Sequence, residues 1–353
     1  MPTDTEPFRQ RPKPSLRQLL CFGGLFILLT ALGLAAVQGA LGGAALQFDP
    51  ALMSPRMIGS VGALMAVYFL ADGFRLHLTL KALGESVPWR DMVHLVFINI
   101  FVSNVTPLAT GGGLAQVWYL ARRGVSIGRA MAATTIRTAL AILVIFALAP
   151  IALVFLPDFA GHPVFGRISW AMVAVGALYL AGFGLLILRT RWLVRALSCG
   201  LGLLEKGGLV SAERCLRWRT RIGKALLEFS QAFRNYLNGP MRYVVGSMVS
   251  TCVFLLSLFS LPALILVNLG HDVGYIATVG KLVVITFIMY FAPTPGAAGI
   301  SEGVFASVFA AQVTAGQLVL VVVVWRFVTI YAGMLVGFVL LQLEIARLGG
   351  QRT

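Results

Sequence analysis

The sequence has 353 residues, of which 58% are hydrophobic and only 12% charged, and its mean hydropathy is +0.88. A soluble domain carries about 25% charged and about 45–50% apolar residues, so this composition excludes an ordinary soluble protein and predicts a chain that faces lipid. A formal net charge of +15 would indicate nucleic-acid binding in a soluble protein, but here the basic residues gather between hydrophobic runs, as membrane topology requires, and we expect no nucleic-acid partner.

The first hydrophobic segment, 17–37, follows a basic tail at 1–16. About 20 apolar residues can cross a bilayer, whereas the apolar region of a signal peptide has about 7–15 residues. We therefore expect a retained first helix, with a cleaved signal peptide as the alternative. A second full span is expected at 57–80.

A broken hydrophobic stretch follows at 92–121. Proline removes an amide donor and glycine clusters weaken helices, so we expect two shorter helices joined by irregular backbone. In lipid, such backbone is tolerated only where protein or a water-filled cavity covers it. The polar and helix-breaking residues of this stretch are Asn104, Thr106, Pro107, Gly111, Gly112 and Gly113.

A second broken stretch lies at 274–312, and full spans surround it. Its helix-breaking residues are Pro293, Pro295, Gly296 and Gly299. The full spans expected after the first broken stretch are 130–156, 168–188, 243–268 and 318–343, and the last of them leads into a short tail at 344–353.

The connection 189–242 contains many more Lys and Arg residues than Glu residues. Within it, apolar residues follow helical spacing over 222–237, while most of the basic residues lie off that stripe. This pattern predicts a helix lying on the anionic cytoplasmic surface of the membrane. Anchoring is the favoured role, and lipid sensing is the alternative.

The distribution of basic residues predicts the orientation, because cytoplasmic loops are enriched in Lys and Arg. Both ends of the first broken stretch are basic, so it enters the membrane from the cytoplasm and returns there. The second stretch then enters from the opposite face. We expect a bacterial-type inner membrane protein with both termini in the cytoplasm. The basic residues that flank the first stretch are Arg75, Lys81, Arg90, Arg122, Arg123 and Arg129.

The order of elements repeats with opposite orientation: two spans, a broken hairpin and a span in each half. The sequence thus predicts an all-α polytopic membrane protein with about six full transmembrane helices plus two broken re-entrant helical hairpins in an inverted-repeat arrangement. Its single transmembrane domain covers 17–343, with halves at 17–156 and 168–343. Inverted repeats place substrate sites near the bilayer midplane, at the interrupted helices. Two unrelated kinked helices are the alternative.

Charged residues inside the apolar segments point to the same region. Arg137 and Arg326 each lie in the span that follows a broken stretch, and Lys281 and Glu302 lie within the second stretch. An arginine at a helix centre costs roughly 2.5–3.5 kcal/mol on insertion scales, so each should face the interior and find a partner. One interpretation is that Arg137 or Arg326 pairs with Glu302 and fixes the fold. The other is that excess positive charge attracts an anionic group, with Asp72 offsetting it unless solvated near the cytoplasm.

Both hairpins lead into a helix after their glycines, and helix N-termini favour anions. The motif from Asn104 to Gly113, the motif from Pro293 to Glu302, and Arg326 followed by Gly333 resemble the lysylphosphatidylglycerol synthase transmembrane, or flippase-like, family over about 15–345. The resemblance implies a lipid-translocating domain, here without the soluble aminoacyltransferase of two-part members. Many members carry Gly-Gly-Glu in the first hairpin, where this chain has Gly113 and then Gln116.

The leading hypothesis is translocation of an anionic lipid or lipid-linked intermediate through a midplane cavity. A membrane-embedded transferase acting on a lipid or polyprenyl phosphate is the first alternative, although no catalytic constellation, metal motif or cofactor motif is found. A partner-dependent assembly subunit or homo-oligomer is the second, since Gly333 and Gly337 form a GxxxG pair that could also pack internally. The residues expected to bind substrate are Arg137, Arg326, Glu302, Lys281, Asn104, Thr106, Pro107, Gly111, Gly112, Gly113, Gln116, Pro293, Pro295, Gly296 and Gly299.

Overall fold

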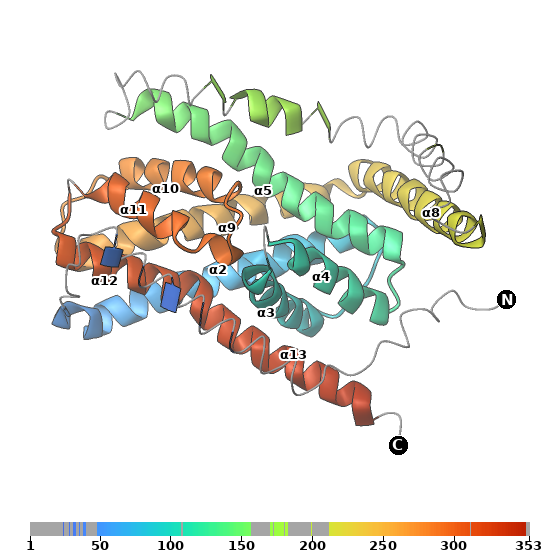
Figure 1. The fold of residues 1–353 in the computed structure, drawn as a ribbon, viewed down its shortest axis with the longest axis horizontal. Helices are drawn as coiled ribbons and strands as arrows, with labels where there is room; N and C mark the ends of the chain where they lie inside the picture. Colours follow the sequence, from blue (N-terminus) through green and yellow to red (C-terminus); the bar gives the residue numbers. More distant parts are fainter. Residues whose placement is uncertain are drawn as a thin grey trace.

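The computed structural model describes residues 48–106, 109–156, 212–310 and 312–350, together with scattered helical positions between 24 and 39 and between 170 and 199. These residues form helices joined by short turns (Figure 1). The basic tail at 1–16, most of the expected span 17–37 and about half of the expected span 168–188 lie outside the described residues, as do most of the residues from 189 to 211.

Four helices of the described part are long and apolar enough to cross a membrane. They confirm the spans expected at 57–80, 130–156, 243–268 and 318–343. The four are α2 (Pro55–Ala82), α5 (Ile127–Phe155), α9 (Met241–Asn268) and the continuous run α12 (Ala315–Arg326), η5 (Phe327–Tyr331) and α13 (Ala332–Gly350). Ser54 and Ser126 cap the starts of α2 and α5 by accepting amide hydrogen bonds from Met57 and Arg129.

Each broken stretch forms two helices joined by irregular backbone, as its glycines and prolines predict. The first consists of α3 (Trp89–Val105) and α4 (Thr110–Arg122). The second consists of α10 (Tyr275–Met289), the short 3-10 turn η4 (Pro295–Ala297) and α11 (Ile300–Phe309). A further 3-10 turn, η2 (Pro50–Met53), precedes α2.

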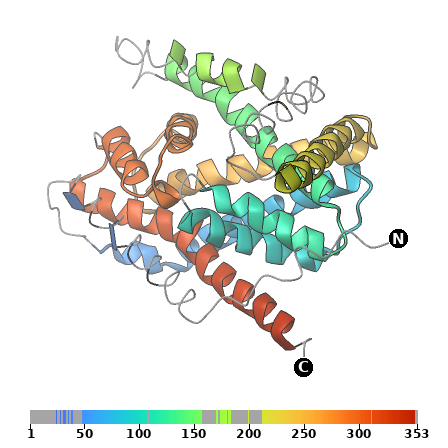
Figure 2. The ribbon, with the colours of Figure 1, turned by 45° about the vertical axis from the view of Figure 1, so that its right-hand side comes forward.

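Contacts between the halves follow the pairing that an inverted repeat requires. Helices α2 and α9, which occupy equivalent positions, pack along their lengths, and their contacts between Ser60 and Asn268 and between Leu78 and Gly246 make them antiparallel. Helix α3 of the first hairpin packs on α13, and α10 of the second hairpin packs on α5. In Figure 1 the second hairpin (α10 and α11) lies toward the left-hand end of the bundle and the first hairpin (α3 and α4) toward the right, and Figure 2 shows the same order. The last span of each half therefore packs against the hairpin of the other half.

The buried apolar residues form two main clusters at the two ends of the helices. One contains the second hairpin with the start of α2 and the ends of α5 and α9. The other contains the first hairpin with the end of α2 and the starts of α5 and α9. The polar, interrupted region lies between them.

Helix α8 (Ala212–Leu237) lies against the start of α5, at the end of the bundle where Arg122, Arg123 and Arg129 lie (Figure 1). Phe229 and Tyr236 are buried, Glu228 approaches Gly128 of α5, and the Tyr236 hydroxyl hydrogen-bonds Ser247 of α9 at 2.7 Å. Burial raises the pKa of the Tyr236 phenol, so this hydroxyl stays neutral. The amphipathic helix is confirmed, but the C-terminal part of its apolar stripe packs on protein rather than on lipid.

Candidate functional site

The turn of the first hairpin is tied by one threonine. The Thr106 hydroxyl donates to the carbonyl of Val102 at 2.8 Å and accepts the amide of Gly111 at 3.0 Å. Gly112 is needed for close approach, because a Cβ there would collide with Ser103 of α3. Gly113 faces open space, and Pro107 lies outside the described residues. The glycines therefore let α4 lie against α3, and the Gly111 amide is already satisfied within the protein.

The turn of the second hairpin relies on left-handed backbone. Gly296 and Gly299 have φ values of +59° and +85°, and Ala297 also lies at +54°. A side chain in this region costs roughly 1–2 kcal/mol, so the surrounding contacts must hold it in place. Pro293 and Pro295 flank the turn, and Pro295 opens η4.

The buried carboxylate of Glu302 connects the start of α11 to Arg326 at the end of α12. Its Oε2 accepts the amide of Gly299 at 2.7 Å and the hydroxyl of Ser301 at 2.8 Å, so the carboxylate neutralises the N-terminus of α11. Arg326 approaches the other oxygen with its Nε at 2.8 Å from Oε1 and donates from Nη2 to the Gly296 carbonyl at 2.7 Å. The expected pairing of Arg326 with Glu302 is thus present, and the α11 N-terminus already has its anion.

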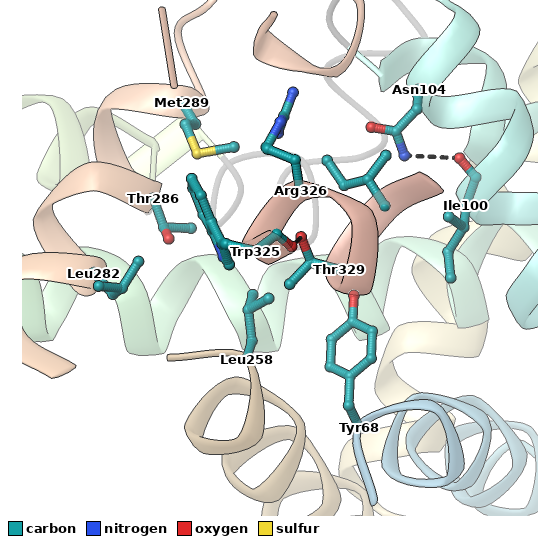
Figure 3. A pocket seen from close by; sticks show the side chains of 11 residues that line it. Tyr68, Ile100, Asn104, Leu258, Leu282, Thr286, Met289, Trp325, Arg326 and Thr329 are labelled. Atoms are coloured by element: carbon teal, nitrogen blue, oxygen red, sulfur yellow. Dashed lines mark hydrogen bonds between the residues drawn. The ribbon is translucent and has the colours of Figure 1, made fainter. Parts of the chain in front are cut away.

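The tips of the two hairpins meet. Asn104, near the end of α3, lies against Gly296, where an added Cβ would come within 2.9 Å of the Asn104 Oδ1. A cavity of about 160 Å³ opens beside this contact (Figure 3). Arg326 and Asn104 lie on facing sides of it, and Tyr68 of α2 points its hydroxyl toward the other labelled residues. The cavity is lined by Tyr68, Ile100, Asn104, Leu258, Leu282, Thr286, Met289, Trp325, Arg326, Thr329 and Ile330.

The wall formed by α12 is interrupted immediately after Arg326. Residues Phe327–Tyr331 form a π-helical turn, and Thr329 within it lines the cavity while its hydroxyl bonds the Trp325 carbonyl at 2.7 Å. Such turns are rare and are found frequently at functional sites.

Lys281 of α10 is a further buried cation in the second hairpin. It is 1% exposed, and its ammonium lies 5.4 Å from the centre of the Phe309 ring. Phe309 stacks on Phe305, which stacks on Trp325 at the cavity wall. We define the outer cluster as the ion pair of Glu302 and Arg326.

Arg137 lies in a second buried cluster, on α5, and pairs with Asp72 of α2. Arg75, one turn after Asp72, lies 3.5 Å from its carboxylate and donates to the Arg137 carbonyl at 2.9 Å. The Arg75 guanidinium also lies over the ring of Phe254, on which Tyr68 stacks, so this cluster borders the cavity wall. We define the inner cluster as Asp72, Arg75 and Arg137, which has two cations and one carboxylate.

One sequence-based assignment was wrong, and the structure decides between two alternatives for another residue. Arg75 was counted among the basic residues that flank the first hairpin, but it is 4% exposed inside the helix bundle. Asp72 was expected to offset the buried positive charge unless it was solvated near the cytoplasm. It is 3% exposed and enclosed by Arg75 and Arg137, so it does offset that charge. Arg137 therefore pairs with Asp72 and not with Glu302.

The expected site residues divide into two groups. Arg326, Asn104, Glu302 and Gly296 come together at the cavity. Gln116 is buried on α4, with its amide nitrogen lacking a hydrogen-bond partner among the described residues, and it does not line the cavity. The lining residues that sequence reasoning missed include Tyr68, Thr286, Trp325 and Thr329.

This arrangement defines a polytopic, all-α membrane protein whose two inverted halves bring helix-breaking hairpins to a buried, charged centre. A model of the lysylphosphatidylglycerol synthase TM region matches residues 20–337, and the chain belongs to this family. It is also similar to a UPF0104 membrane protein from Archaeoglobus fulgidus, with 21% identity over 282 residues that cover 78% of this chain and 82% of that protein. The family resemblance inferred from the hairpin motifs is thereby confirmed.

Proposed function

We propose that this protein translocates an anionic lipid or lipid-linked intermediate between the leaflets of the membrane. The observation that supports this function best is the meeting of the two hairpin tips beside two buried charged clusters, of which the inner one has two cations and one carboxylate. The inner cluster therefore has one more positive than negative charge among Asp72, Arg75 and Arg137. Buried positive charge is expensive in a membrane, and an anionic headgroup passing the centre would offset that cost.

The arrangement of the two hairpins would let the proposed path open toward either face of the membrane. In transporters built from inverted repeats, interrupted helices line a central site and the repeats move against each other. Here Asn104 of the first hairpin and Gly296 of the second are in contact, so separating the tips would open the cavity toward either end. Arg326 and Arg137 would attract the headgroup, and Glu302 would position Arg326.

The family assignment supports a lipid as the substrate, since the matching model is described by the name of a synthase of lysylphosphatidylglycerol. Transport is proposed rather than chemistry because both buried carboxylates near the centre, Asp72 and Glu302, are committed to arginines on other helices. Each carboxylate therefore holds an arginine in position.

The proposed orientation places α8 and both termini in the cytoplasm of a bacterial-type cell. Basic side chains gather at one end of the described bundle, where Arg129 pairs with Glu85, Arg123 pairs with Asp91 and Lys81 lies over Tyr243. A cysteine-free chain with either Gly124→Cys or Thr314→Cys tests this in intact cells. Labelling of Thr314→Cys alone by an impermeant maleimide supports the orientation, and labelling of Gly124→Cys alone reverses it.

The function is tested by lipid exchange in proteoliposomes containing the full chain and fluorescent anionic or zwitterionic lipids. We expect exchange that favours the anionic lipid and that falls in Lys281→Met, which removes one buried positive charge. Lys81→Met is the matched control, because it removes a charge from the cytoplasmic end. Equal exchange of both lipids, or equal loss in both variants, would reject the proposed role of the buried charge.

A further inference from the structure

The two limbs of the first hairpin are tied together at their base by Arg123. This residue directly follows α4, and its Nε donates to the Asp91 carboxylate in the first turn of α3 at 2.9 Å. The Tyr119 hydroxyl of α4 donates to the same carboxylate oxygen at 2.7 Å and accepts from the Arg123 Nη2 at 2.9 Å. Because these short hydrogen bonds join α3 to α4, the hairpin should move as one body.

One contact of the same guanidinium leaves the hairpin. The Arg123 Nη2 lies 3.3 Å from the Glu344 Oε1 of α13, which makes this ion pair longer than the contacts of Arg123 within the hairpin. The Arg123 side chain is 32% exposed and the Glu344 side chain 7% exposed. Since water reaches the guanidinium, this ion pair is weak enough to break and form again.

Helices α3 and α13 also touch at a point deeper in the bundle. A Cβ at Gly337 would come within 2.0 Å of the Phe97 carbonyl oxygen, so the two backbones are in close contact there. Glu344 lies two turns further along α13, about 10 Å away at a rise of ~1.5 Å per residue. A small rotation of the hairpin about the Gly337 contact would therefore separate Arg123 from Glu344 while α3 stays packed on α13.

We propose that Arg123 and Glu344 form a gate at the cytoplasmic end of the path. The gate is closed while the ion pair is formed, and it opens when the first hairpin rotates away from the end of α13. This inference rests on the proposed function and names a contact that regulates access to the cavity. The tip of the same hairpin carries Asn104, which contacts Gly296, so the rotation would also part the hairpin tips.

The base of the second hairpin is joined to its neighbour by different chemistry. The hydroxyl groups of Tyr275, the first residue of α10, and Ser260 of α9 are hydrogen-bonded at 2.7 Å. A neutral hydroxyl pair does not depend on charge, whereas the pair of Arg123 and Glu344 does. Removing one charge at the first hairpin should therefore open one end of the path and leave the other end as it is.

The gate is tested by the accessibility of the cavity in a cysteine-free full chain that carries Thr286→Cys, since Thr286 lines the cavity. An impermeant maleimide is applied to membrane vesicles of either sidedness, and the face from which Gly124→Cys is labelled defines the side of the gate. Glu344→Gln removes the charge that reaches across to Arg123. The matched control is Glu85→Gln, which removes a carboxylate that pairs with Arg129 of α5 instead. Thermal unfolding verifies that all variants are folded.

We expect Glu344→Gln to speed labelling about fivefold from the side of the gate alone, which corresponds to the ~1 kcal/mol of a partly exposed ion pair. Glu85→Gln should label at the rate of the parent Thr286→Cys chain. Faster labelling from both faces would mean a general loosening of the fold, and an unchanged rate would mean a passive contact. Either result overturns the gate. The expected labelling in a chain that exchanges no lipid would leave the gate standing and remove the proposed function.

Discussion

Arg326 and Gly296 are joined by a hydrogen bond of 2.7 Å from the guanidinium Nη2 to the backbone carbonyl oxygen. The same guanidinium pairs with Glu302, which in turn accepts the amide of Gly299. One arginine thus satisfies both sides of a helix break that lipid could not solvate. The second hairpin is held by charge at its tip, whereas the first is held at its tip by the hydroxyl of Thr106.

Removing Arg326 should destabilise the protein through the carboxylate left behind. Glu302 is 1% exposed, and breaking a buried ion pair by deleting one partner costs about 3–5 kcal/mol. We expect Arg326→Met to lower the melting temperature strongly, and Glu302→Gln in the same chain to restore much of it. Thermal unfolding of the two single variants and the double variant gives the coupling energy, with the exposed Arg56→Met as control. If the stability losses of the two single variants add up to that of the double variant, Arg326 and Glu302 are not energetically coupled.

In the inner cluster, removing the charge of the carboxylate should cost more stability than removing one of the two cations. Asp72→Asn leaves Arg75 and Arg137 buried together without a carboxylate, whereas Arg75→Met leaves the pair of Asp72 and Arg137 intact. We therefore expect Asp72→Asn to cost several-fold more free energy of unfolding than Arg75→Met, by the same charge argument. Chemical unfolding in detergent measures both. A larger cost for Arg75→Met would mean that its contact with Phe254 outweighs its charge.

The contact between the hairpin tips should make Gly296 intolerant of a methyl group. Its φ of +59° favours glycine, and an added Cβ would lie 2.9 Å from the Asn104 Oδ1. Gly296→Ala should cost roughly 1–2 kcal/mol from the backbone alone. Gly303→Ala is the matched control, because it lies in α11 with nothing within 4 Å of the added Cβ, and it should be neutral or slightly stabilising. If both variants melt together, the tip contact does not constrain the hairpin.

Much of the fold could be predicted because its signals are local. The length of each apolar run predicts a span, and prolines and glycines predict where a run breaks. The breaks at 104–113 and 293–299 were therefore found from the sequence, and Arg326 with Glu302 could be considered as a pair because the two residues are close in the chain. The antiparallel packing of α2 on α9 follows from the inverted order of elements.

The inner cluster could not be predicted from these signals. The positive-inside rule counts basic residues but does not measure depth, so Arg75 was counted with the cytoplasmic flank. Asp72 and Arg137 are 65 positions apart in the sequence, and only the packing of α2 on α5 brings them together. The i,i+3 spacing of Asp72 and Arg75 within an apolar run was the available signal. Tyr68, Thr286 and Trp325 gave none, because a neutral residue within an apolar run changes neither its charge nor its length.

The GxxxG pair of the last span is used inside the chain, so its substitution should affect folding before assembly. Gly333 packs on Ile100, and a Cβ at Gly337 would collide with the backbone carbonyl of Phe97. Overpacking of this kind costs about 1–3 kcal/mol, and here it would separate α13 from α3 and disturb the first hairpin. We expect Gly337→Ala to lower the melting temperature, while the exposed Gly62→Ala, with open space around its Cβ, leaves it unchanged or raised. Size-exclusion chromatography with light scattering supplies the second readout. A change of oligomeric state in Gly337→Ala at unchanged stability would instead assign this glycine face to contact between copies of the chain.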